Sequence, residues 1–215
     1  MPPVLREFKR SSEFRDSQLF IIATEGQKTE HKYFNDFYSY PLFRNPRIYI
    51  HVIRRIKSAS SPVHILAELD KIKSEYKWRQ DDELWMVVDK DAWKAKHLST
   101  VARLCNQKNY FLAVSNPCFE LWLLLHVKDI PKCSPSDQKL HTKKQYLIAE
   151  LKRILRGYNK NNPDTDKLFP TIRLAIDRAR ILDTNPLDRW PQTLGTRVYL
   201  LTSKLLTLCP KCPHQ

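Results

Sequence analysis

Asp89 and Asp91 are separated by one residue and directly follow the apolar run of residues 84–88. This run lacks polar alternation, which is typical of a strand covered on both faces of a parallel sheet. If the chain stays extended through Lys90, both carboxylates leave on the same side, with Cα atoms about 7 Å apart. Two carboxylates so placed can bind one or two Mg²⁺ ions. The alternative for an isolated D-x-D is a solvated turn in which an aspartate caps the next helix.

Two more acids are predicted at the same edge of the sheet. Glu25 follows the apolar run 18–24, and Glu120 lies just inside the helix expected after the run 110–115. Because the carboxyl ends of parallel strands share one edge, we expect these side chains to converge with Asp89 and Asp91. A divalent cation in such a cluster could bridge to phosphate and activate water, while Glu25 or another carboxylate moves protons.

The elements that must position these acids are strands that alternate with helices. Strands are predicted at residues 18–24, 47–54, 84–88 and 110–115, and helices from residue 29, from residue 62, at 97–107 and from about residue 119. Four strand-then-helix units with little room for hairpins indicate right-handed crossovers and a parallel sheet. We therefore predict an α/β fold, with a Rossmann-like parallel β-sheet flanked by helices, over residues 18–129.

The chain after residue 130 has a different pattern. A polar loop precedes amphipathic helical patterns at residues 145–157, 169–182 and 193–208. We predict a C-terminal helical subdomain over residues 130–208 that packs on the sheet. Residues 1–17 are predicted to form a basic N-terminal arm and residues 209–215 a tail.

The charge of the chain suggests a polyanionic partner. The 215 residues include 37 Lys and Arg against 23 Asp and Glu, for a formal net charge of +14. Cationic side chains release counterions from a phosphate backbone, so nucleic acid is the leading candidate and solubility is the alternative. The candidate contacts lie in distributed basic segments and include Arg54, Arg55, Lys94 and Lys96.

The cysteines and the hydropathy indicate a cytoplasmic protein that does not enter a membrane. The five cysteines are an odd number, and neither a secretion signal nor an apolar run of about 18 residues is present. We therefore expect reduced thiols. Cys209, Cys212 and His214 have metal-ligand spacing, but without a second ligand pair a frayed terminus is preferred to a zinc site.

Four motifs resemble the RloB family. In chain order they are A-T-E-G-Q-K-T-E (23–30), V-V-D-K-D (87–91), S-N-P-C-F-E-L-W-L-L-L-H (115–126) and Y-N-K (158–160). The resemblance covers residues 19–208, and the third motif is its most specific part. Proteins of this family are bacterial, are often encoded with antiphage defence genes, and are similar to Toprim-domain proteins. The Toprim pattern is an acid after the first strand and an Asp-x-Asp after the third.

The resemblance implies roles for the acids. Glu25 takes the position of the catalytic Toprim glutamate, and Asp89 and Asp91 take metal-binding positions. The family commonly has an acid directly after the Asp-x-Asp, whereas this chain has Ala92. A third ligand at that place is therefore missing.

Other residues in the motifs receive roles from their chemistry. Glu120 is a candidate metal ligand, and Lys160 is a candidate for stabilising phosphoryl charge, with a solvated lysine as the alternative. Asn116 could cap a helix or hold a phosphate. Glu30 is a further candidate, or an acid that is simply favoured at a helix N-terminus. His126 is expected to be a packed residue rather than a base.

The predicted function is a Toprim-type nuclease. It would use Mg²⁺ (or Mn²⁺) to hydrolyse phosphodiester bonds in DNA or RNA and would act as an effector of antiphage defence. The alternative is a non-catalytic sensor that binds a nucleotide or nucleic acid and works with a partner ATPase encoded nearby. A homo-oligomer is compatible with both.

Overall fold

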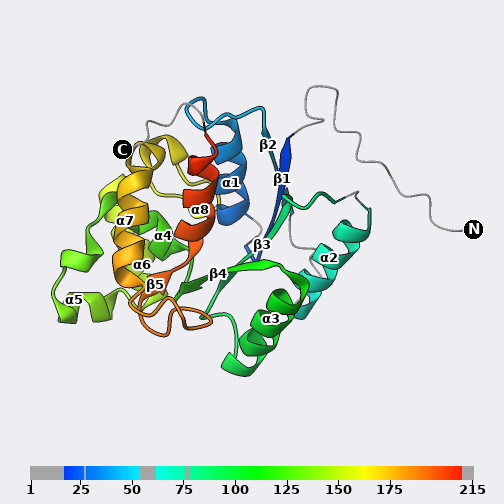
Figure 1. Ribbon diagram of the computed structural model, residues 1–215. Helices are drawn as coiled ribbons and strands as arrows, with labels where there is room; N and C mark the ends of the chain where they lie inside the picture. Colours follow the sequence, from blue (N-terminus) through cyan, green and yellow to red (C-terminus); the bar gives the residue numbers. More distant parts are fainter. Residues whose placement is uncertain (1–16, 27, 54–61, 76–77, 210–215) are drawn as a thin grey trace, which may run out of the picture.

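The computed structural model describes residues 17–26, 28–53, 62–75 and 78–209, which form a five-stranded sheet with helices on both faces (Figure 1). The strand order is β2-β1-β3-β4-β5. The strands are β1 (Gln18–Thr24), β2 (Ile48–Ile53), β3 (Glu83–Asp89), β4 (Phe111–Asn116) and β5 (Gly195–Thr196). The first four are parallel, which confirms the predicted α/β fold with a parallel sheet.

The centre of the sheet is apolar on both faces. Every residue of β3 is buried, as its unbroken hydrophobic run predicts, whereas the edge strand β2 alternates between buried and half-buried residues. Alternate side chains of the four parallel strands enter two separate hydrophobic clusters, one on each side of the sheet. The sheet therefore holds the ends of β1, β3 and β4 in fixed register.

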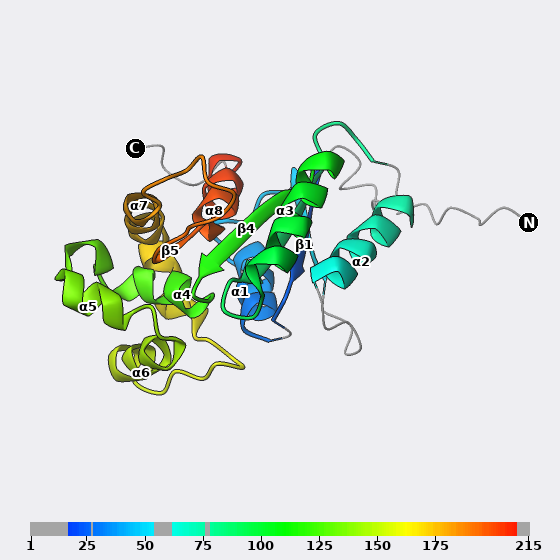
Figure 2. The same ribbon diagram turned by 90° about the horizontal axis from the view of Figure 1, so that it is seen from below.

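Two layers of helices cover the sheet (Figures 1 and 2). One face carries α2 (Pro62–Glu75) and α3 (Ala95–Lys108), through apolar residues such as Leu69 and Val101. The other face carries α1 (Thr29–Ser39) and α4 (Glu120–Val127). Helix α4 is apolar nearly all round and is buried along most of its length, because further helices pack over it.

Those further helices come from the C-terminal part of the chain. They are α5 (Pro135–Leu140), α6 (Lys144–Leu155), α7 (Ile172–Leu182) and α8 (Val198–Thr207), with 3₁₀ turns at Ile130–Lys132, Thr165–Lys167 and Phe169–Thr171. The apolar stripes of α6, α7 and α8 join the same cluster as α1 and α4. The C-terminal helices thus pack on one face of the sheet.

The structure differs from the sequence prediction in two segments. Residues 193–197 were expected in a helix, but Gly195 and Thr196 form β5, antiparallel to β4, and the helix begins at Val198. The Thr196 hydroxyl lies 2.7 Å from that of Ser115, so pairing with the sheet edge overrides the helical pattern there. The polar segment near residue 135 was expected as a loop but forms α5, with Ser134 as its N-cap and proline in its first turn.

The C-terminal end of the described chain packs against the segment that follows α1. Cys209 is buried, and its thiol donates a hydrogen bond to the carbonyl of Leu42 at 3.0 Å. Cys212 and His214 lie outside the described residues. No described helix combines the length and apolar character needed to cross a membrane.

Candidate active site at the carboxyl edge of the sheet

Glu25 and Asp89 meet because they end adjacent parallel strands. Thr24 of β1 is paired with Val87 of β3, and the Glu25 amide donates to the Val87 carbonyl at 3.0 Å. The Glu25 carboxylate in turn accepts hydrogen bonds from the Asp89 amide at 3.0 Å and from the Trp93 indole at 2.7 Å. Glu25 is therefore held against the start of the loop that carries Asp91.

Asp89 and Asp91 face a common ammonium group. The amides of Lys90 and Asp91 donate to the carbonyls of Ser115 and Pro117, so the chain continues along β4 after β3 ends. Lys144 Nζ, from the start of α6, lies 3.4 Å from Asp89 Oδ2 and 3.2 Å from Asp91 Oδ2. Both aspartates thus point toward the same position, as their spacing suggests.

Asp89 is also bound to the start of α4. Its Oδ1 accepts the Phe119 amide at 2.8 Å, at a helix end where a negative charge is favoured. Burial nevertheless raises the pKa of Asp89 well above its ordinary value, and the nearby Glu30 raises it further. A cation is therefore needed to keep this carboxylate ionised at low cost.

Glu120 is almost fully buried and is paired with Lys160. Lys160 Nζ lies 2.7 Å from Glu120 Oε1. Burial raises the pKa of Glu120, but the Lys160 ammonium beside it outweighs this effect, and the pKa lies below its ordinary value. The lysine is about half exposed, so it links this buried acid to the surface.

Glu30 lies in the same cluster, in the first turn of α1. Burial raises its pKa to about 7, and the Glu120 carboxylate adds to the increase. Its close neighbour is Gly26, where an added Cβ would lie 1.8 Å from Glu30 Oε2. The glycine in the E-G-x-x-T-E motif therefore leaves the space that the Glu30 carboxylate occupies.

Cys118 completes a set of donors that could hold a metal ion. One donor atom each from Asp89, Cys118 and Glu120 lies within 4.8 Å of the others, and all three residues are buried. Burial raises the pKa of the Cys118 thiol, so Cys118 stays protonated at neutral pH, whereas Glu120, whose pKa is lowered, is a charged donor. Carboxylate oxygens suit Mg²⁺ and Mn²⁺, and a thiolate would suit a softer metal.

Tyr158 lies beside the cluster with its hydroxyl buried. The residue is 7% exposed, and the hydroxyl has no hydrogen-bond partner within the part of the chain that the structure describes. Burial raises the pKa of Tyr158, and the charges of Glu120 and Glu30 add to this effect. Such buried polar groups in a native protein normally bind water, an ion or a ligand.

Comparison with known proteins gives one assignment. The family model described as RloB-like protein matches residues 20–205, which span every residue of the cluster. The chain belongs to the RloB-like family. Neither the curated proteins nor the solved structures that were compared with it yield a match.

The other predicted site residues of this RloB-like chain are one asparagine and four basic residues. Asn116 donates to the carbonyls of Pro191 at 3.1 Å and Thr193 at 2.6 Å, so it holds the loop before β5 instead of capping α4. Lys94 and Lys96 are exposed at the start of α3, shortly after Asp91. Arg54 and Arg55 lie outside the described residues.

His126 occupies a structural position in the RloB-like fold. It is buried between Tyr33, whose hydroxyl lies 3.1 Å from Nε2, and the Leu168 carbonyl, 2.8 Å from Nδ1. Burial lowers its pKa to about 3, so the ring is neutral. The expectation of a packed histidine agrees with this geometry.

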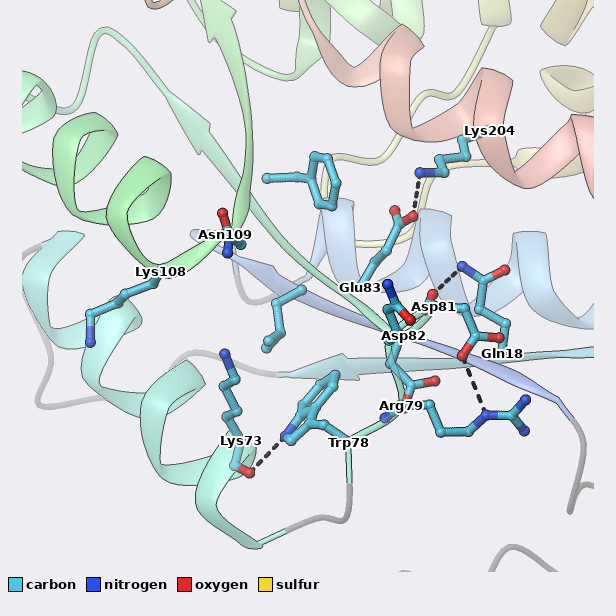
Figure 3. Close-up of a pocket in the computed structure, with 13 residues that line it drawn as sticks. Gln18, Lys73, Trp78, Arg79, Asp81, Asp82, Glu83, Lys108, Asn109 and Lys204 are labelled. Carbon is cyan, nitrogen blue, oxygen red and sulfur yellow. Dashed lines mark hydrogen bonds and ion pairs between the residues drawn. The ribbon is translucent and has the colours of Figure 1, made fainter.

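A separate pocket of about 480 Å³ lies at the amino ends of the strands, away from the acidic cluster (Figure 3). Gln18 and Glu83, the first residues of β1 and β3, contribute to its lining, whereas the acidic cluster lies at the other ends of these strands. Lys204 forms an ion pair with Glu83, and Arg79 forms one with Asp81. The group of potential metal ligands found among the described residues lies in the acidic cluster and not in this pocket.

Two members of the cluster were not identified from the sequence. Lys144 appears there only as part of a basic run, and Cys118 only as a reduced thiol. Cys118 lies two residues before Glu120 in the most specific motif, which was a usable signal. Nothing in the local sequence of α6 indicates that Lys144 reaches the ends of β3.

Proposed function

We propose that this RloB-like chain is a metal-dependent nuclease that hydrolyses phosphodiester bonds in DNA or RNA, with Mg²⁺ or Mn²⁺ as its cofactor. The observation that carries the proposal is the buried donor set of Asp89, Cys118 and Glu120 at the carboxyl edge of a parallel sheet. Glu25 and Glu30 lie beside this set. When bound there, the metal would polarise a phosphoryl oxygen and activate water.

The side chains around the donor set have distinct tasks in this proposal. Glu25, fixed by the Asp89 amide and the Trp93 indole, accepts a proton from the attacking water. Lys160 stabilises negative charge on the phosphoryl group, since its ammonium is half exposed beside Glu120. Glu30, with a pKa of about 7, holds a proton that it can give to the leaving oxygen.

Charge supports a nucleic-acid substrate. The protein has a formal net charge of +14, although its candidate catalytic cluster is acidic. Lys94 and Lys96 are exposed on the segment that follows Asp91, where they can contact the phosphate backbone next to the scissile bond. With the family membership, we propose a cytoplasmic effector of antiphage defence.

A non-catalytic role is the second candidate. Lys144 and Lys160 already pair with three carboxylates of the cluster. A cluster neutralised in this way could bind a nucleotide or nucleic acid as a sensor without cleaving it. In that case the protein would bind metal or nucleotide but would release no product from any polymer.

Cleavage assays separate the two functions. Labelled single-stranded DNA, duplex DNA and RNA are incubated with wild type, Glu25→Gln and Asp89→Asn, in Mg²⁺, in Mn²⁺ and in EDTA. We expect metal-dependent cleavage that falls by about 100-fold or more in both variants. Asp177→Asn is the control, because Asp177 is an exposed acid of α7 and should leave the rate unchanged. Equal cleavage by all four proteins would refute the proposed site.

A further inference from the structure

Lys144 occupies a position between two carboxylates that a metal ion could otherwise bridge. Its Nζ lies 3.4 Å from Asp89 Oδ2 and 3.2 Å from Asp91 Oδ2. The lysine side chain is 31% exposed and that of Asp89 is 11% exposed, so solvent screens this contact less than a surface ion pair. The ammonium group is therefore a structural component of the acidic cluster.

The placement of Lys144 is not explained by the helix that carries it. Lys144 is the first residue of α6, where the partial positive charge of the helix disfavours a cation. The helix itself is anchored by Leu147 and Leu151, both fully buried in the core shared with α4. The main chain is therefore fixed by packing, while the two aspartates hold the ammonium.

We infer that Lys144 takes the place of a second divalent cation, so that each chain binds a single metal ion. The inference rests on the proposed function and specifies its metal requirement. The metal would be held by Asp89, Cys118 and Glu120, and Asp91 would bind Lys144 instead of a metal. An ammonium has three N–H donors, and two of them face Asp89 and Asp91. The third is left to bind a phosphate oxygen, which the second metal binds in two-metal sites.

The position between the two aspartates offers a metal few protein ligands, so an ammonium competes with it effectively. Ala92, which follows Asp91, offers no side-chain oxygen. Asp91 does not belong to the donor set of Asp89, Cys118 and Glu120. Among the described residues, no other three potential metal ligands lie this close together. Without the ammonium, a second Mg²⁺ would have Asp91 and a shared Asp89 as protein ligands, with waters and phosphate completing its octahedron, so it is Lys144 that excludes the ion.

A titration with Mn²⁺ measures how many metal ions each chain binds. The full-length protein is titrated with Mn²⁺, and free ion is measured from its electron paramagnetic resonance signal, for wild type and Lys144→Met. Methionine keeps the apolar stem and removes the charge. Lys143→Met is the control, because Lys143 is the exposed neighbouring lysine. Lys144→Arg retains a cation, and circular dichroism checks that each variant is folded.

The inference predicts about one Mn²⁺ per chain for wild type, Lys143→Met and Lys144→Arg. It predicts about two for Lys144→Met, with spectral broadening because ions in a two-metal site lie about 4 Å apart. Two ions in wild type, or one ion in Lys144→Met, would overturn the inference and leave the proposed function standing. Absence of binding in every variant would overturn both.

Discussion

Glu30 makes the free energy of unfolding depend on pH. Burial raises its pKa from 4.5 to about 7 in the folded protein. Between these pH values the folded chain binds more protons than the unfolded chain, so stability falls as pH rises from about 4.5 to about 7. The side chain is only 7% exposed, and the difference of about 2.5 in pKa corresponds to about 3 kcal/mol.

Glu30→Gln removes this titration while keeping the shape of the side chain. We expect the stability of the variant relative to wild type to increase by about 3 kcal/mol between pH 4.5 and pH 8. Urea unfolding in EDTA, at several pH values, measures this difference. Groups that lie away from Glu30 titrate equally in both proteins and cancel, whereas Asp89, whose pKa Glu30 raises, adds to the difference in the same direction.

Glu150→Gln is the matched control. Hydrogen bonds from Arg153 and Lys128 lower the pKa of Glu150 to about 2, so its contribution is complete above about pH 4.5 and is lost only as pH falls toward 2. This variant should differ from wild type by a constant amount between pH 5 and pH 8. If the Glu30→Gln difference is equally constant, the burial and proton affinity that we assign to Glu30 are wrong.

Three further changes test other parts of the structure. Gly26→Ala should lower the free energy of unfolding by about 1–3 kcal/mol, measured by urea unfolding, because the added Cβ would lie 1.8 Å from an oxygen of the buried Glu30 carboxylate and displace it. Cys118→Ser should change Mg²⁺ affinity by less than about threefold and lower Zn²⁺ affinity by more than about tenfold, measured by calorimetry, since the thiol suits the softer ion. Asp183→Asn should lower the free energy of unfolding by about 3–5 kcal/mol, because it leaves the Arg197 guanidinium, 3.0 Å away and buried, without its charge partner. An unchanged urea midpoint would contradict this last expectation.

The sequence was sufficient to locate the acidic edge. The apolar runs before Glu25 and Asp89 define parallel strands, and parallel strands bring their carboxyl ends together whatever lies between them. Glu120 follows from the same reasoning, because it begins the helix after β4. These positions depend on local patterns and on one general property of α/β sheets.

Contacts made by distant helices could not be predicted in the same way. Lys144 lies 55 residues from Asp89 in the chain, and its approach depends on how α6 packs against α4. Likewise, Gly195 and Thr196 leave a helical pattern because β4 has an edge that they can pair with. In both cases tertiary contacts decide the outcome, and a single sequence does not specify them.

The central claim is that Asp89, Cys118 and Glu120 hold a divalent metal at the edge of the sheet. A crystal of the protein soaked in Mn²⁺ tests it directly, through anomalous scattering from the ion. We predict a single anomalous peak within about 2–2.5 Å of carboxylate oxygens of Asp89 and Glu120, with Lys144 still bound to Asp91. A fully occupied Mn²⁺ elsewhere on the protein, with this donor set still empty, would contradict the account.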